Sequence, residues 1–425
     1  MRLRGLSFFL RRNDLRRVFT GALVFVALIA VSFARSGAQT APVSPGPAPS
    51  PTATPTPPWS VSGFADVTYT TPLAAGGTFV FTNGTSDRVF DGITGNGTAT
   101  PSMTRFVPNA FNINIRKNAT QGLGGQLEVT LGSDANVINS YGYTPNTYTD
   151  VTQGFLYYAA GPWTLDVGKF ETLAGYEVIE SPSDNNISRS ILFGYAIPFT
   201  HTGVRLVYAP TSHFSATAGV NFGWDQIRST TGLGTIEGGL SWNPSSALSF
   251  SGDFYTGKEP SALTPFPPTG ATIYGTRTLL DLVGHWNPSS KWNFGLNYDI
   301  ATQTNDQSFT STGAIVTSGA VPALGTVNWN GLAGYALLNL NANVTLAGRL
   351  EHFDDANGVR TGIAQAWNEG TATLQYVPTS TNWKFRAEYR CDWSNVASFA
   401  RYTSPAGTAA ANNSSLGAEV IYTFP

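Results

Sequence analysis

A strict two-residue alternation runs through FSATAGVNF (residues 214–222), where apolar side chains at even positions alternate with small or polar ones at odd positions. The same period recurs in WNFGLNYDI (292–300) and WKFRAEYRC (383–391). A period of two is that of a β-strand with two different faces, whereas an amphipathic helix has a period of 3.6. No segment of helical length after Trp59 carries a comparable apolar stripe, so the sequence predicts an all-β fold.

Extending this pattern along the chain indicates about sixteen strands. They start near Trp59, Ala110, Gly125, Asp150, Trp163, Thr200, Phe214, Thr235, Leu248, Thr272, Trp292, Val327, Val344, Gln365, Trp383 and Ser414. The alternation is ambiguous in the strands near Asp150, Thr272 and Val327, which leaves the count open by about two strands.

The connections between these strands fall into two classes of length. Every second connection is a tight turn, such as Gly161-Pro162 or Pro288-Ser289-Ser290, and most of the others are long, including residues 71–109, 171–199, 303–326 and 394–413. An even strand number with short turns at one end and long loops at the other is typical of a transmembrane antiparallel up-and-down β-barrel. The short turns would be periplasmic and the long loops extracellular.

Aromatic residues flank the tight turns and form a predicted girdle at one membrane interface. They are Trp59, Trp163, Phe214, Trp242, Trp286, Trp292 and Trp383. The charges provide a second test, because an Arg or Lys facing the bilayer midplane costs roughly 2–4 kcal/mol. On the clearest strands they lie opposite the large apolar residues, as in Arg116, Glu128, Arg205, Asp253, Asp299, Arg349, Glu351, Lys384, Arg386, Glu388, Arg390 and Glu419. This sorting gives each strand one apolar and one polar face, and the aromatic girdle together with an N-terminal export signal favours lipid outside and a polar lumen inside.

A barrel of sixteen strands is too wide for wall side chains to fill, so it encloses an aqueous channel unless something plugs it. The candidate constriction is the segment 171–199, which carries Glu171, Glu177, Glu180, Asp184 and Arg189. Folded inward, it would set charge selectivity against wall residues. The candidate wall residues are Arg116, Glu128, Arg205, Asp299, Arg349, Glu351, Arg386 and Arg390. The alternative is that the segment forms an extracellular cap.

The N-terminal region has the features of an export signal. Six arginines precede an apolar run over residues 18–33, and Ser36-Gly37-Ala38 provides small residues for cleavage. We expect a signal peptide over 1–38, a proline-rich periplasmic linker over 39–58 and the barrel over 59–425; an uncleaved membrane anchor is the alternative. Cleavage would remove seven basic residues and one acidic residue, leaving 17 basic against 25 acidic and a net charge of -8.

The last strand alternates up to Phe424 and is similar to the C-terminal signal that the barrel-assembly machinery recognises, although Pro425 follows where an aromatic residue usually ends the chain. The segments GKFET (168–172), GYE (175–177), SRSILF (188–193) and IPFTHTGVR (197–205) resemble the OmpL-like putative β-barrel porin-2 family. This resemblance implies a Gram-negative outer-membrane channel for small hydrophilic solutes. It implies no particular substrate.

Composition and motifs argue against other functions. The full chain has a net charge of -2, which gives no reason to expect nucleic-acid binding, and a single Cys excludes an intramolecular disulfide. The four histidines have no metal-ligand spacing, and no nucleophile elbow, Walker loop or dinucleotide fingerprint is present. We therefore expect no catalytic residues, no cofactor and no metal.

The sequence thus favours an outer-membrane porin for passive diffusion of small hydrophilic solutes or ions. A surface-binding or anchoring barrel with a plugged lumen is the main alternative, and a barrel enzyme is a third. The expected partners are outer-membrane lipid, the barrel-assembly machinery and the solutes, and a homotrimer is compatible with a sixteen-stranded porin.

Overall fold

The computed structural model describes residues 58–73, 90, 105–140, 148–230, 232, 234–261, 273–312, 314–318, 321–400 and 409–425. The expected signal peptide and the linker up to residue 57 lie outside these residues.

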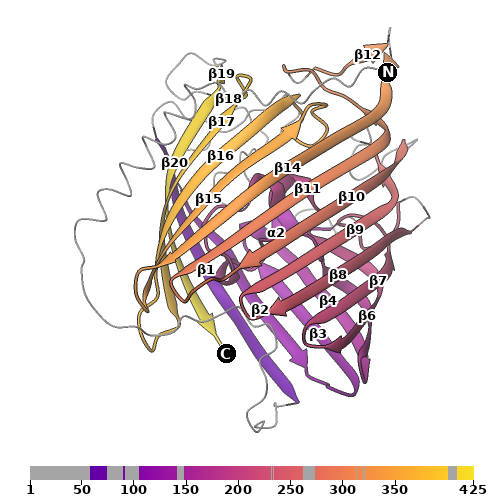
Figure 1. Ribbon diagram of the computed structural model, residues 1–425. Coiled ribbons are helices and arrows are strands. Elements are labelled where there is room, and N and C mark those ends of the chain that lie inside the picture. The colour runs from indigo at the N-terminus through magenta and orange to yellow at the C-terminus, as the bar shows by residue number, and fades with distance from the viewer. Residues whose placement is uncertain are drawn as a thin grey trace. The chain divides into compact units, whose positions relative to one another are not determined.

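Sixteen antiparallel strands pair with their neighbours in chain order and close into one barrel, in which β1 pairs with both β2 and β20 (Figure 1). The strands are β1 (Trp59–Leu73), β2 (Arg105–Lys117), β3 (Gly122–Leu131), β4 (Thr149–Ala160), β5 (Trp163–Glu171), β6 (Thr200–Thr211), β7 (Phe214–Asn221), β8 (Thr235–Ser245), β9 (Leu248–Pro260), β10 (Tyr274–Trp286), β11 (Trp292–Gln307), β14 (Leu324–Asn339), β15 (Val344–Asp355), β16 (Gln365–Tyr376), β17 (Trp383–Ser394) and β20 (Asn412–Phe424). The predicted fold class is confirmed.

Strand positions follow the sequence alternation closely. Ten of the sixteen strands start at the residue that the alternation indicated, and the other six start within five residues of it. The structure adds two small two-stranded sheets, β12 (Thr317–Ser318) with β13 (Val321–Pro322) and β18 (Phe399–Ala400) with β19 (Ala409–Ala410). Strands of two residues are too short to show a period, which is why the sequence did not indicate them.

In the connections, the described residues form three short helical elements: α2 (Ser133–Ile138) between β3 and β4, and η1 (Ser181–Ser183) and the π-helix η2 (Leu192–Ala196) between β5 and β6. In the described part of the chain, no helix is both long and apolar enough to cross a membrane.

The two faces of the barrel wall differ as the charge pattern predicted. Large apolar side chains alternate outward and are exposed, and they include all seven aromatic residues of the expected girdle. Several of these rings stack on neighbours beside the short turns, as Trp242 does on Phe250 and Trp286 on Phe294. On the clear strands, the charged residues occupy the alternate positions whose side chains face the barrel interior. The outer surface is therefore suited to hydrocarbon.

The barrel interior is less polar than the sequence pattern suggested. A cluster of buried apolar side chains joins the β5–β6 connection to inward positions of the wall, among them Leu192, Phe193, Trp329, Phe353 and Trp367. The hydrophobic core of the protein thus lies inside the barrel, where it holds one connection against the wall.

Candidate functional site

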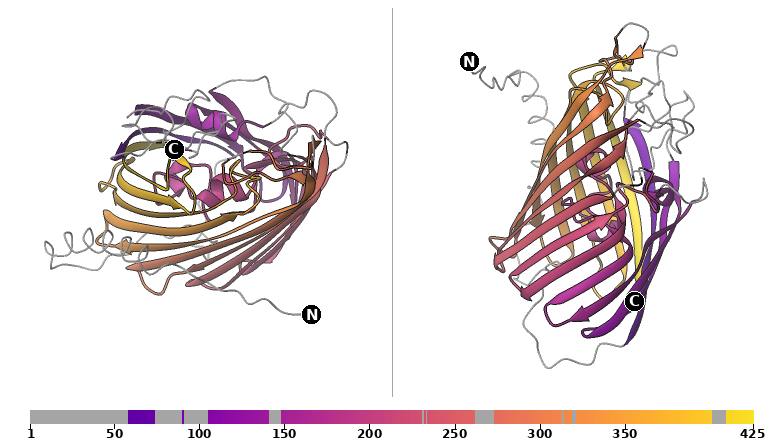
Figure 2. Two further views of the ribbon diagram at one scale, coloured as in Figure 1. Left: turned by 90° about the horizontal axis from the view of Figure 1, so that it is seen from above. Right: turned by 90° about the vertical axis from the view of Figure 1, so that its right-hand side faces the viewer.

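The β5–β6 connection folds into the barrel instead of covering its mouth. We call residues 171–199 the inner loop. Seen from above, it lies within the ring of strands (Figure 2). Its side chains and backbone contact inward residues of β9, β11, β14, β15, β16, β17, β20 and β1. The candidate constriction segment therefore occupies the lumen in this structure.

Two positions without a side chain make room for the start of the inner loop. Gly175 adopts a φ of +106°, and a Cβ there would lie 2.7 Å from Cδ1 of Ile197. A Cβ on Gly295 of β11 would lie 2.1 Å from the ring of Tyr176. That ring stacks between His285, with centroids 4.7 Å apart, and Tyr335, at 3.9 Å. Gly295 therefore leaves room for the Tyr176 ring, and Gly175 supplies the positive φ in the residue before it.

Two wall carboxylates hold the middle of the inner loop through its backbone. Glu388 of β17 accepts hydrogen bonds from the backbone N–H groups of Ile187, at 2.6 Å, and Ser188, at 3.0 Å. Glu351 of β15 accepts them from Ile191, at 2.7 Å, and Leu192, at 2.5 Å. Hydrogen bonds to an ionised acceptor are stronger than neutral ones. Each carboxylate thus satisfies two loop amides that would otherwise be buried without partners.

Three wall arginines bind loop carbonyl oxygens. Arg349 donates to the carbonyl of Ser188 at 2.7 Å, and Arg390 donates to that of Arg189 at 2.6 Å. Arg386 donates to the carbonyls of Ser181 and Asp184. Wall residues predicted to line a free lumen are therefore buried against the inner loop.

Ion pairs link the inner loop to the wall and to itself. Arg349 lies 2.6 Å from Glu177 of the loop and also 2.6 Å from Glu369 of β16. Within the loop, Arg189 lies 2.8 Å from Asp184. Burial raises the pKa of Asp184 to about 7, although the guanidinium of Arg189 acts in the opposite direction.

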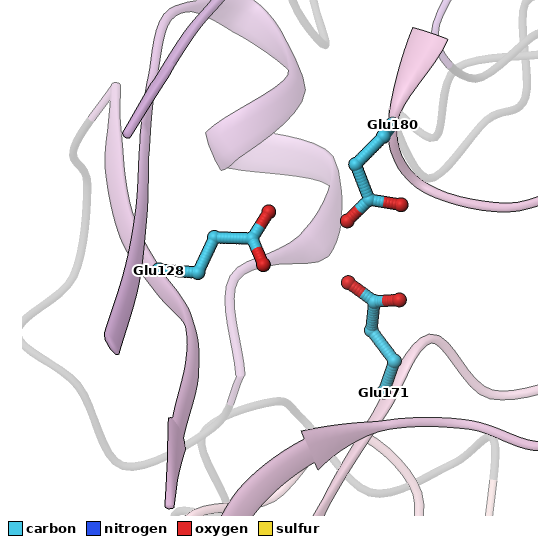
Figure 3. Close-up of side chains that lie close together, drawn as sticks. All are labelled: Glu128, Glu171 and Glu180. Carbon is cyan, nitrogen blue, oxygen red and sulfur yellow. The ribbon is translucent and has the colours of Figure 1, made fainter. Parts of the chain in front are cut away.

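A group of three carboxylates stands on the side of the inner loop away from β15–β17. Glu128 of β3, Glu171 at the end of β5 and Glu180 of the inner loop point toward one another, with ligand oxygens all within 4.8 Å (Figure 3). Burial and the neighbouring Glu171 carboxylate raise the pKa of Glu180 well above its ordinary value. These oxygens could contact a cation, but three carboxylates are fewer ligands than the six to eight that Ca²⁺ takes.

The other predicted wall residues are placed separately. Arg205 of β6 pairs with Glu237 of β8 at 2.7 Å and lies over the ring of Phe170. Arg116 of β2 is exposed, with its guanidinium 5.8 Å from the centroid of Tyr157. Asp299 of β11 is fully buried.

Several residues that hold the inner loop were not singled out as site residues from the sequence. Glu388 was placed on the polar face but was not assigned to a site, and Glu369 carried no distinguishing signal. Asp281 was missed because the phase of its strand, near Thr272, was ambiguous. The polar-face pattern could have found Glu388; only the folded chain brings it to the loop amides.

Comparison with solved structures shows the fold. The outer membrane channel DcaP of Acinetobacter baumannii is 14% identical with a TM-score of 0.56, over 86% of this chain and 97% of that one. The anion-selective porin from Comamonas acidovorans is 11% identical with a TM-score of 0.53, over 86% and 99%. OmpT of Vibrio cholerae, described in a trimer form, is 11% identical with a TM-score of 0.52, over the same shares. A comparison with curated proteins found no match.

The family comparison extends over nearly the whole barrel. The sequence model of the family described as "Putative beta-barrel porin-2, OmpL-like" matches residues 61–424, which run from the first strand to the last. With its closed barrel of sixteen strands, the chain belongs to this family and is an outer-membrane porin.

Proposed function

We propose that small hydrophilic solutes or ions diffuse through an aqueous passage between the inner loop and the β2–β8 side of the wall. The inward side chains of β14–β17 are buried against the inner loop, whereas several inward polar side chains on the other side stay accessible. They include Asn114, Arg116, Gln126, Asp166, Ser215, Thr217 and Ser241. This one-sided accessibility is the observation that carries the proposal.

The inner loop would act as the constriction of this passage. Glu128, Glu171 and Glu180 form its acidic side, and Arg116 stands among the accessible residues of the facing wall. Carboxylates at a constriction attract cations and repel anions. We therefore propose a preference for cations, with no covalent step and no enzyme activity.

Blocking by a charged thiol reagent tests the passage. Cysteines would be introduced into a Cys391→Ala background at Thr217, which faces inward, and at its neighbour Ala218, which faces outward. In planar bilayers, a charged methanethiosulfonate should reduce the conductance of the Thr217→Cys channel and leave that of Ala218→Cys unchanged. Purified wild-type protein that inserts but shows no conductance steps would contradict the proposed passage and support an anchoring barrel with a plugged lumen.

We also propose export with cleavage near Ala38, assembly through the C-terminal strand, and a homotrimer in the bacterial outer membrane. The trimer form described for OmpT of Vibrio cholerae supports the last point. Native mass spectrometry of protein extracted from outer membranes would give the mass of the assembly and of one subunit. The subunit mass shows whether the first 38 residues have been removed, and the ratio of the two masses gives the number of subunits.

A further inference from the structure

Three aspartates lie side by side on the inner wall. Asp253 of β9 is the register partner of Asp281 of β10, and Asp281 is the partner of Asp299 of β11. Directly opposite residues of antiparallel strands have Cβ atoms about 4.5–5.5 Å apart. The exposed fractions of the three residues are 4%, 0% and 0%. Like charges are therefore brought together in a buried place.

Neither Asp281 nor Asp299 has a cationic partner among the described residues. Both carboxylate oxygens of Asp299 are buried and accept no hydrogen bond there, and the same holds for Oδ2 of Asp281. The guanidinium of Arg205, which faces Asp253, is paired with Glu237. That of Arg349, which faces Tyr335, is paired with Glu177 and Glu369. Two facing carboxylates without a counter-charge cannot both be ionised at little cost in a buried site.

A proton fits this pair better than a metal ion. Ca²⁺ takes six to eight oxygen ligands, and Mg²⁺ takes six in octahedral geometry. The neighbouring amide of Asn297 cannot supply another oxygen freely. Its Nδ2 donates to Oδ1 of Asp281 at 2.6 Å, and its Oδ1 accepts the backbone N–H of Tyr176 at 3.1 Å.

We propose that Asp281 and Asp299 share one proton, and that this proton keeps the start of the inner loop docked on the wall. Asn297 joins the two, because it bonds Asp281 on one side and the backbone of Tyr176 on the other. Loss of the proton leaves a second negative charge buried beneath Tyr176. Hydrating that charge requires the loop to move away, so the loop is docked in acid and released as pH rises.

The acidic groups nearest the pair also favour the shared proton. Asp253 of β9 faces Asp281, and Glu351 of β15 faces Asp299. One layer further out, Glu237 of β8 and Arg205 of β6 face Asp253, and Glu177 of the inner loop and Arg349 of β15 face Tyr335 of β14. Tyr176 of the inner loop stacks on Tyr335 and on His285 of β10. Asp253 and Glu351 are acidic and favour the shared proton. The two arginines are already paired with carboxylates.

Hydrogen–deuterium exchange of the full mature protein in detergent tests the docking directly. The exchange rates are first corrected for the intrinsic effect of pH. Above the pH at which half of the molecules have lost the shared proton, protection of amides in residues 172–178 of the wild type should fall by about tenfold per pH unit, since release requires loss of one proton. Asp299→Asn and Asp281→Asn should keep their protection at alkaline pH. The outward Asp354→Asn variant serves as the matched control and should behave like the wild type.

Infrared titration supplies the second measurement. Compared with the wild type and with Asp354→Asn, Asp299→Asn should lack the carbonyl band of one buried protonated carboxyl. Equal loss of protection in Asp299→Asn and the wild type would overturn the proposal. Loss of protection on adding a chelator at constant pH would also overturn it, because a metal ion would then hold the pair. Conductance plays no part in the test, so failure of the porin proposal would leave this result interpretable.

Discussion

Arg349 of β15 and Glu177 of the inner loop form a buried ion pair, with Nη1 and Oε1 2.6 Å apart. The same guanidinium also binds Glu369 of the neighbouring strand. One arginine therefore bridges a loop carboxylate and a wall carboxylate, and this contact joins the inner loop to the barrel.

Replacing Arg349 with Met should detach the inner loop. Glu177 would then lose its paired cation, while Glu369 would keep only Arg390, 3.6 Å away. Breaking a buried pair by removing one partner costs about 3–5 kcal/mol. We expect larger and noisier single-channel conductance in planar bilayers. The exposed Arg116→Met is the control for loss of an inward arginine and should keep quiet channels. An unchanged Arg349→Met channel would show that this pair does not hold the loop.

The two carboxylates that bind loop amides should act on different segments. Glu388→Gln weakens bonds to Ile187 and Ser188, and Glu351→Gln weakens bonds to Ile191 and Leu192. A hydrogen bond to a charged group contributes about 1.5–3 kcal/mol. Exchange of residues 187–188 should be faster in the first variant, and exchange of residues 191–192 in the second. Each variant is the control for the other, and identical exchange maps would refute separate anchors.

Asp184 should make the η1 region of the inner loop sensitive to pH. Its pKa is raised to about 7 in the docked loop, so the docked state binds the proton more tightly than a released loop with an ordinary carboxyl. Docking is therefore fully favoured below about pH 4 and weakens as pH rises toward 7. Amide exchange over residues 178–186 should show this trend, and Asp184→Asn should remove it. A trend that persists in Asp184→Asn would have to come from another group.

Charge removal at the acidic constriction should change ion selectivity. Glu180→Gln removes one carboxylate from the group with Glu128 and Glu171. Because the pKa of Glu180 is raised, the channels are compared at alkaline pH, where this carboxyl is ionised. The reversal potential in a KCl gradient should then move toward the anion side, with little effect in the neutral control Ser215→Ala, which changes an inward residue of β7. Equal reversal potentials in Glu180→Gln and the wild type would show that Glu180 does not contribute to ion selectivity.

The cost of placing a charged side chain on the outer face should depend on its depth in the bilayer. Leu280→Arg, on the outward face of β10, should lower the free energy of unfolding from liposomes by roughly 2–4 kcal/mol if the site lies near the midplane. Asn328→Arg, outward near the start of β14, should cost about 0–1 kcal/mol. Unfolding by guanidinium chloride, followed by tryptophan fluorescence, gives the change in free energy of unfolding for both variants. Equal costs would mean that the two sites do not differ in depth.

Strand positions could be predicted from the sequence because a lipid-facing wall imposes a local rule. Each residue that faces hydrocarbon must be apolar, so the alternation in 292–300 and 383–391 is visible without any knowledge of the partner strand. The same rule placed Arg349, Glu351, Arg386 and Arg390 on the inner face. It could not indicate which of them would be free in the lumen, because that depends on residues far away in the chain.

By itself, the sequence determined the barrel, the positions of its clear strands, the position of the girdle and the inward face of each clear strand, since these follow from periods of two and from the cost of charge in lipid. Barrel closure in the structure fixed the count at sixteen strands. Only the tertiary structure decided the course of the inner loop. Glu177 meets Arg349, Ile187 meets Glu388 and Tyr176 meets Asn297 across more than one hundred residues of chain. Such contacts depend on barrel closure and register, which bring distant strands to one side of the lumen, and no local pattern encodes them.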